Sequence, residues 1–92
     1  MSFNNLLLLG NQYMLDINVR GSICQETNSM RYSVEFRYLG HMCEVKDGAL
    51  LRAAVGYGGS LDEAANDYYN KIKEKTLVCA AYSAGRREII IE

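Results

Sequence analysis

One stretch of the chain, residues 55–80, narrows the folds that the remainder can adopt. Its pattern indicates a strand, a glycine turn, a capped helix and a second strand. Ser60 and Glu63 have the spacing of a capping box, in which the hydroxyl accepts from the Glu63 amide and the carboxylate accepts from the Ser60 amide. We therefore predict that residues 61–73 form the only substantial helix and lie across a sheet. Its buried stripe follows from apolar residues at three- and four-residue spacing: Leu61, Ala64, Ala65, Tyr68 and Ile72.

The segments around this helix show the two-residue alternation of half-buried strands. In the first two, an apolar face opposes a charged face, which indicates an antiparallel sheet with one side in water. The strand after the helix is apolar on both faces and is predicted to be central, and Asp47-Gly48 predicts a hairpin. Strands are predicted over residues 12–20, 31–39, 41–46, 49–56, 76–82 and 86–91.

The leucine run at residues 6–9 is flanked by Asn4 and Asn5 on one side and by Gly10 on the other. Because asparagine can cap a helix and glycine can end one, one or two helical turns are an option, and a buried extended segment is the other. The run is far shorter than a signal-peptide core or a membrane span, so no membrane association is predicted. The predicted fold class is α+β: a single domain, residues 1–92, with a mostly antiparallel β-sheet and one main α-helix packed on one face, in the order β-β-β-β-α-β-β.

The charge balance bears on the class of partner. Ten lysines and arginines against eleven acidic residues give a net charge of −1. A dedicated nucleic-acid-binding protein usually has a basic excess, because contacts to phosphates supply most of its affinity. Nucleic acid therefore ranks below a protein as the partner. A local basic patch stays open, either on the wet sheet face (Arg20, Arg31 and Arg37) or at the end of the helix (Lys71, Lys73 and Lys75).

The three cysteines, Cys24, Cys43 and Cys79, are far apart and form no Cys-x-x-Cys pair. With a single histidine they cannot complete a zinc site of the usual kind. We expect reduced thiols in a cytoplasmic protein, with a disulfide or redox role as the alternative. No metal and no cofactor are predicted.

The glycine turn Gly56-Tyr57-Gly58-Gly59 precedes the predicted helix, where free amides and the helix dipole could hold an anion or a small ligand. The turn has neither the ending of a P-loop nor the spacing of a dinucleotide-binding fingerprint. Asp62 and Glu63 in the first helical turn would also repel a phosphate. A structural turn is therefore the preferred interpretation.

Acidic residues on the predicted strands raise the option of a metal-dependent nuclease. Asp16, Glu35 and Glu44, with Lys46 two positions after Glu44, have the residue types that can hold a metal and position a water. Their spacing is ordinary for strands with one charged face in water. His41 has no serine, cysteine or aspartate partner at motif spacing. We therefore expect no catalytic residues and no enzymatic activity.

Seven tyrosines and no tryptophan make interface residues a reasonable expectation. Tyr68 belongs to the buried stripe, so its neighbour Tyr69 is predicted to point outward. Exposed tyrosine offers a large contact area at low entropy cost and is enriched at interfaces. The predicted binding residues are Tyr57, Tyr69, Lys73, Arg86 and Arg87.

Residues 59–68, Gly-Ser-Leu-Asp-Glu-Ala-Ala-Asn-Asp-Tyr, resemble the start of the helix in HicB-type antitoxins, which has the pattern Gly-x-Ser/Thr-x-Glu-Glu-Ala-x-x-Asn-Ala. The resemblance covers roughly residues 50–80. It implies a HicB-like or dsRNA-binding-domain-like fold, with antiparallel strands before one helix and a strand after it. The chain has no helix-turn-helix or ribbon-helix-helix segment, so the resemblance does not extend to operator binding.

Taken whole, the chain also resembles small uncharacterised proteins of bacteriophages that infect Gram-positive hosts. The shared features are the glycine turn, a Leu-x-Glu-Ala helix and an Arg-Arg-Glu-Ile ending, here residues 86–89. This resemblance implies a phage accessory protein in the host cell cytoplasm that binds and inhibits a host or defence protein, as an anti-CRISPR protein does. It implies no catalytic residues.

Three functions are therefore expected, in this order. The first is a non-enzymatic protein-binding module, such as a phage-encoded inhibitor of a bacterial defence system. The second is a nucleic-acid-binding or HicB-like antitoxin domain that uses a basic sheet or helix face. The third is a small-ligand binder at the glycine turn. A homodimer is a further expectation, because residues 88–91 are apolar on both faces and a twofold contact would cover them.

Overall fold

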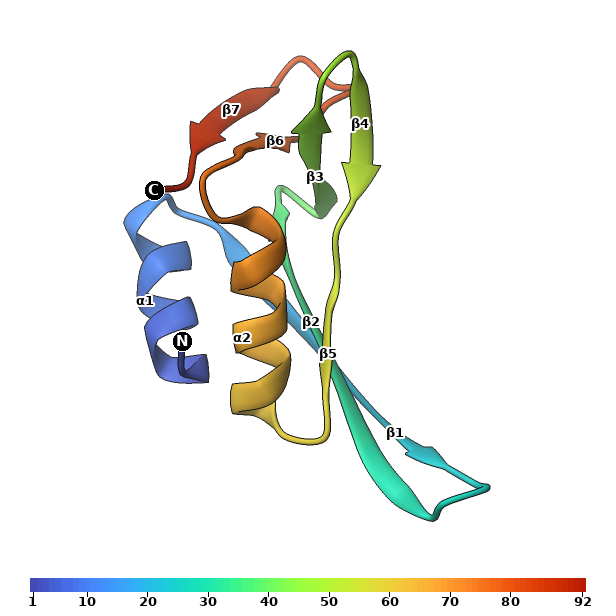
Figure 1. The fold of residues 1–92 in the computed structure, drawn as a ribbon. Coiled ribbons are helices and arrows are strands. Elements are labelled where there is room, and N and C mark those ends of the chain that lie inside the picture. The colour runs from blue at the N-terminus through green and yellow to red at the C-terminus, as the bar shows by residue number, and fades with distance from the viewer.

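In the computed structural model, all 92 residues are described, and they form a helix, five strands, a second helix and two strands. The two helices lie side by side on one face of the sheet, and the first strand pair extends away past them (Figure 1). The molecule is consequently elongated, 42 × 24 × 23 Å. Neither helix is long and apolar enough to span a bilayer. The elements are α1 (Phe3–Gln12), β1 (Asp16–Cys24), β2 (Ser29–Tyr38), β3 (His41–Asp47), β4 (Leu50–Ala53), β5 (Gly56–Gly58), α2 (Leu61–Ile72), β6 (Thr76–Cys79) and β7 (Arg87–Ile90).

Every pair of neighbouring strands is antiparallel, so the predicted α+β class with a mostly antiparallel sheet is confirmed. The main path through the sheet is β1-β2-β3-β6-β7, with β4 beside β3 and β5 beside β2. Strand β6 lies between β3 and β7, which confirms the prediction that the strand after the helix is central. The predicted fourth strand is divided at Ala54 and Val55, because its first part pairs with β3 and its second part with β2.

The prediction of only one substantial helix is wrong, because α1 is a second helix of ten residues. Its N-cap is Ser2, whose hydroxyl accepts from the Asn5 amide at 3.1 Å. The helix continues through Gly10 to Gln12, into residues that were predicted to begin a strand. Gly10 packs against the ring of Phe36, where an added Cβ would be 2.9 Å from a ring carbon. Close packing, and not chain termination, is therefore what this glycine provides.

Helix α2 agrees closely with the prediction. The Ser60 hydroxyl accepts from the Glu63 amide at 3.1 Å. The Glu63 carboxylate accepts from the Gly59 amide at 3.1 Å, and not from the Ser60 amide as predicted, so the reciprocal bond is shifted by one residue. Leu61 is only half-buried, and the remainder of the predicted stripe is buried: Ala64, Ala65, Tyr68 and Ile72.

The centre of the core is the contact between α2 and β2. The rings of Tyr68 and Phe36 meet edge to face, with centroids 5.3 Å apart and planes at 84°. The Tyr68 hydroxyl also accepts from the Phe36 amide at 3.0 Å, and burial raises the pKa of Tyr68 well above its usual range. Gly56 on β5 has no space for a Cβ, because the Ala64 carbonyl oxygen and the Tyr68 Cβ occupy it. The prediction of a turn at residues 56–59 is therefore wrong in part, because Gly56–Gly58 form β5 and pair with β2. The missing side chain of Gly56 lets α2 lie directly on the sheet.

The buried cysteines and the final strand complete this core. Cys43 and Cys79 face each other across β3 and β6 as free thiols, with their sulfurs 3.2 Å apart. The Cys79 thiol and burial raise the pKa of Cys43, which keeps its thiol neutral. Ile89 and Ile91 are buried, whereas Ile90 is 69% exposed. The broad apolar patch expected at the last strand is therefore reduced to one isoleucine.

Candidate binding surfaces of the projecting hairpin

The hairpin formed by β1 and β2 projects beyond the helices (Figure 1), and its two faces carry different side chains. Residues directly opposite each other in an antiparallel pair share a face. One face carries the pairs Ile17–Phe36, Val19–Val34, Gly21–Tyr32 and Ile23–Met30, and the other carries Asn18–Glu35, Arg20–Ser33, Ser22–Arg31 and Cys24–Ser29.

The first face is buried under the helices and then emerges into solvent. Val34 and Phe36 are fully buried, but exposure is 41% at Val19, 60% at Ile23 and 42% at Met30. We call these last three side chains the exposed apolar face. Next to it, the N-terminal turns of α1 and α2 and the side chain of Tyr32 enclose a shallow hollow. The exposed apolar face therefore lies beside a shallow hollow at the N-terminal ends of the helices.

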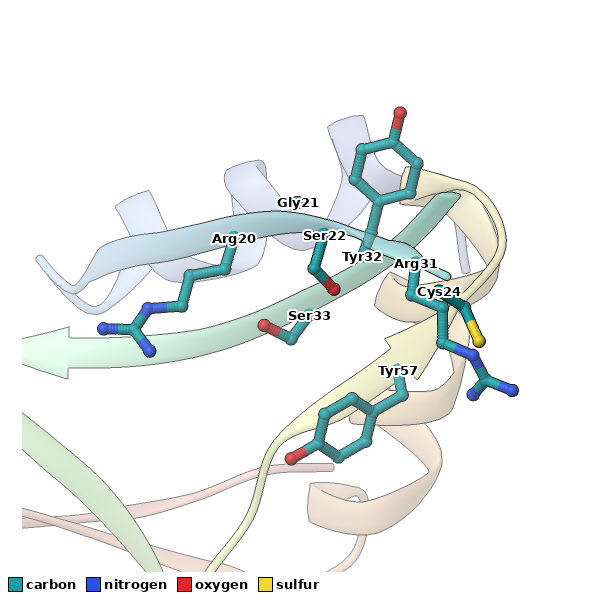
Figure 2. A pocket seen from close by; sticks show the side chains of 8 residues that line it. All are labelled: Arg20, Gly21, Ser22, Cys24, Arg31, Tyr32, Ser33 and Tyr57. Carbon is teal, nitrogen blue, oxygen red and sulfur yellow. The ribbon is translucent and has the colours of Figure 1, made fainter. Parts of the chain in front are cut away.

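The second face forms an open concavity of about 860 Å³, shown from close by in Figure 2. The side chains of Arg20 and Arg31 extend toward its two ends, and the hydroxyls of Ser22 and Ser33 and the ring of Tyr57 lie between them (Figure 2). We call this the arginine concavity. Tyr57 comes from β5 and joins the face because it pairs with Ser33.

The arginine concavity has uncompensated positive charge. Neither Arg20 nor Arg31 lies within ion-pair distance of an acidic side chain. Arg37, predicted to contribute to the same basic face, instead forms an ion pair with Glu35 at 3.1 Å. The placement of Glu35 on a solvated face was wrong, because its side chain is buried and one carboxylate oxygen accepts from Asn18 and Arg37. The predicted basic sheet face is therefore narrowed to two arginines.

The backbone of Tyr57 is anchored to helix α2. Its amide donates to Asp67 on α2 at 2.9 Å, and the Lys71 ammonium lies 5.2 Å from the ring centroid. The Tyr57 amide, and after it the Lys71 side chain, hold the pKa of Asp67 below its usual range. The ring remains 55% exposed. An exposed aromatic ring on an anchored backbone is thus part of the arginine concavity.

Cys24, to which the sequence pattern assigned no role, lies at the rim of the arginine concavity. A hydrogen bond from the Thr27 hydroxyl, with backbone bonds at Thr27 and Glu26, lowers the pKa of the Cys24 thiol. The signal that could have found this environment is the polar run around Thr27, because such residues fold back on nearby groups in turns. Cys24 is also the one thiol in the chain that is not buried.

The structure does not bring the five predicted binding residues together. Tyr57 lines the arginine concavity, whereas Tyr69, predicted to point outward, is half-buried and donates to the Glu92 carbonyl at 3.0 Å. Lys73 is exposed at the C-cap of α2, and Arg86 is exposed with Glu88 at 3.8 Å. Arg87 donates to the Tyr13 carbonyl at 2.8 Å and lies 4.8 Å from the centre of the Tyr38 ring. Tyr69 and Arg87 therefore both make contacts within the chain, and a binding role for either residue stays a prediction.

The structure also bears on two other options from the sequence, a metal-dependent nuclease and an anion site at residues 56–59. No group of three histidine, cysteine, aspartate or glutamate side chains is arranged to hold a metal ion. Lys46 forms an ion pair with Glu88 at 3.4 Å, and Asp16 lies opposite Arg37. At the glycine turn, the amides of Tyr57 and Gly59 donate to carboxylates of α2. Donors that could have held an anion there are already bonded within the chain.

Comparison of the chain with protein-family models, with curated proteins and with solved structures gives no match.

Proposed function

We propose that the protein is a non-enzymatic protein-binding module and that the projecting hairpin is its contact element. The observation that carries the proposal is the exposed apolar face, where Val19, Ile23 and Met30 continue the core pattern beyond the cover of the helices. Apolar side chains gathered beside a concave surface are typical of protein interfaces. Water contact with these side chains is unfavourable, and a partner would remove it.

The edge of the hairpin supports the same function. Strand β1 is nine residues long and pairs only with β2, so the backbone groups of alternate residues along its outer edge have no strand partner. An extended segment of another protein can add to such an edge through main-chain hydrogen bonds. The hairpin therefore offers a partner both apolar side chains and backbone donors and acceptors.

For the partner, we propose a host or defence protein, with this chain acting as a phage-encoded inhibitor of the anti-CRISPR kind. The support is the resemblance of the whole chain to small bacteriophage proteins, together with a contact element that needs no catalytic group. An inhibitor of this kind acts by occupying a surface, and a projecting hairpin suits insertion into a groove of the target. A cytoplasmic location follows from the same proposal.

We also propose that the fold is HicB-like. The capped helix on an antiparallel sheet supports it, and the added helix α1 departs from the expected order. A homodimer through the edge strand β7 is likewise proposed, with Ile90 at the twofold contact. Light scattering tests the dimer, since a mass that stays at 10.4 kDa at every concentration contradicts it.

Affinity capture with matched variants tests the protein-binding function. The tagged protein is compared with a hairpin double variant, Ile23→Glu with Met30→Glu, in extracts of a Gram-positive host. The control is Leu8→Glu with Leu50→Glu, which adds the same charge at side chains that are 65% and 62% exposed elsewhere. We expect the hairpin variant to lose a protein that the control retains, and direct titration with that purified protein to repeat the difference. Equal capture by both variants would contradict the proposal.

A further inference from the structure

The arginine concavity faces away from the exposed apolar face and is not used by the protein-binding function. Its two cations, Arg20 and Arg31, lack acidic partners, and the hydroxyls of Ser22 and Ser33 lie between them. Guanidinium and hydroxyl donors are the groups that contact phosphate oxygens in nucleic-acid complexes. The donor set is therefore suited to a ligand that carries more than one phosphate.

Tyr57 adds a second kind of contact. Its ring is 55% exposed, and the bond from its amide to Asp67 fixes the backbone that carries it. Nucleic-acid bases stack on exposed aromatic rings with little dependence on sequence. Arg20, Ser33 and Tyr57 lie in one row across β1, β2 and β5, and Arg31 lies two residues from Ser33 along β2. The surface thus presents two cations and one aromatic ring around the serine hydroxyls, groups that suit the phosphates and bases of a single strand (Figure 2).

From this arrangement we infer a second binding site, for a short single-stranded nucleic acid, in the arginine concavity. Arg20 and Arg31 bind successive or near-successive phosphates, the serine hydroxyls donate to the same backbone, and one base stacks on Tyr57. A duplex does not satisfy the site, because its bases are already stacked inside the helix. An acidic peptide would use the arginines but would have no planar group for the tyrosine ring.

The net charge of −1 is compatible with this site, because only a local patch is involved. Two phosphate contacts predict a logarithmic salt slope of about −1.4 for a single strand. The affinity is accordingly modest at physiological salt. This inference is independent of the protein partner, which is proposed to bind the opposite face of the hairpin.

Fluorescence anisotropy with labelled RNA and DNA strands of about ten nucleotides tests the site, and the two strands distinguish the sources of the phosphate. The charge variant is Arg20→Gln with Arg31→Gln. Its control, Lys46→Gln with Arg52→Gln, removes the same charge from exposed side chains on β3 and β4, outside the concavity. We expect the arginine variant to weaken binding at least about tenfold and to flatten the salt slope, while the control variant changes neither.

Tyr57→Ala separates a nucleic acid from other anions. Loss of one stacked base predicts about tenfold weaker binding with an almost unchanged salt slope. An acidic peptide of similar length and charge serves as the competing ligand. Equal binding of that peptide, with no effect of Tyr57→Ala, would overturn the nucleic-acid assignment in favour of an acidic protein segment.

Cys24 reports occupancy of the site directly, because it lines the concavity and the other two thiols are buried. We expect a saturating single strand to slow the reaction of Cys24 with a soluble thiol reagent, and the arginine variant to abolish that protection. All altered side chains are on the surface, and circular dichroism verifies that the variants are folded. Binding that is unaffected by the arginine variant, or no binding by either strand, refutes the inference. Neither result affects capture of a protein by the apolar face.

Discussion

The two ends of the β1–β2 hairpin have the same sequence pattern and opposite environments. Under α2, Val34 and Phe36 on β2 are fully buried, whereas Ile23 and Met30 near the tip are 60% and 42% exposed. All four side chains lie on one face of the same pair of strands. The difference is caused by the two helices, because Tyr68 of α2 and Gly10 of α1 both pack against Phe36 and neither helix reaches the tip (Figure 1).

The comparison shows that having an apolar face and having that face covered are separate properties of a strand. A period of two residues says that one face of a strand is apolar, but it does not say what covers that face. Where the chain supplies the cover, the apolar face becomes core. Where it does not, the same pattern becomes a candidate interface.

The largest expected effect is at the covered end. Tyr68→Ala removes a buried ring and the acceptor for the Phe36 amide, so we expect a loss of about 3–5 kcal/mol in the free energy of unfolding. Ile23→Ala at the uncovered end is expected to change it by less than about 0.5 kcal/mol. Urea denaturation of both variants measures the difference. A large cost for Ile23→Ala would mean that the tip is covered in solution, for example by a second copy of the chain.

Two glycines extend the comparison to the backbone. In Gly56→Ala the new methyl group meets the Ala64 carbonyl and the Tyr68 Cβ, so α2 must move, and we expect a loss of about 3 kcal/mol. In Gly21→Ala the nearest atom is the Met30 Cε at 3.5 Å, an ordinary contact. Because alanine restricts the unfolded chain, this variant is expected to be neutral or more stable by up to about 1 kcal/mol. Thermal denaturation that ranks the two in the opposite order would show that α2 does not lie on β5 as described.

A smaller effect is expected at the start of α2. Ser60→Ala removes the hydroxyl that accepts from the Glu63 amide, which typically costs about 1 kcal/mol. Ser22→Ala, a matched change in the arginine concavity, is expected to cost less than about 0.5 kcal/mol. Chemical denaturation is the measurement, and an unchanged midpoint for Ser60→Ala would place the beginning of the helix elsewhere.

The smallest effect concerns the turn at the tip of the hairpin. It is a change in the reactivity of Cys24 and not in the free energy of unfolding. The thiolate is the reactive form of cysteine, and the Thr27 hydroxyl lowers the pKa of Cys24. We therefore expect the rate of Cys24 alkylation to reach half its maximum at a lower pH in the native protein than in Thr27→Val. A shift in the opposite direction, or none, would show that the turn does not hold Thr27 against the thiol. Cys43 and Cys79 are expected to react only after unfolding, since both are buried.

Helix α2 and the strand alternation followed from the sequence because their signals are short-range. A capping residue and its amide partner are three positions apart, and a buried stripe repeats every three or four positions. The antiparallel arrangement and the hairpin after β3 were predicted on the same basis. Each of these features depends only on the types of residues that lie a few positions apart in the sequence.

Helix α1, the burial of Glu35 and the arginine concavity were decided by tertiary structure. The leucine run was ambiguous by itself, because its helix is stabilised by contacts to distant residues, including the bond from the Phe3 amide to Asp62. Tyr57 joins Arg20 and Arg31 only because β5 pairs with β2. Phe36 and Tyr68, which decide where the hairpin is covered, are 32 positions apart. Local sequence patterns cannot predict such pairings, because the burial that stabilises them forms only when the distant segments are in contact.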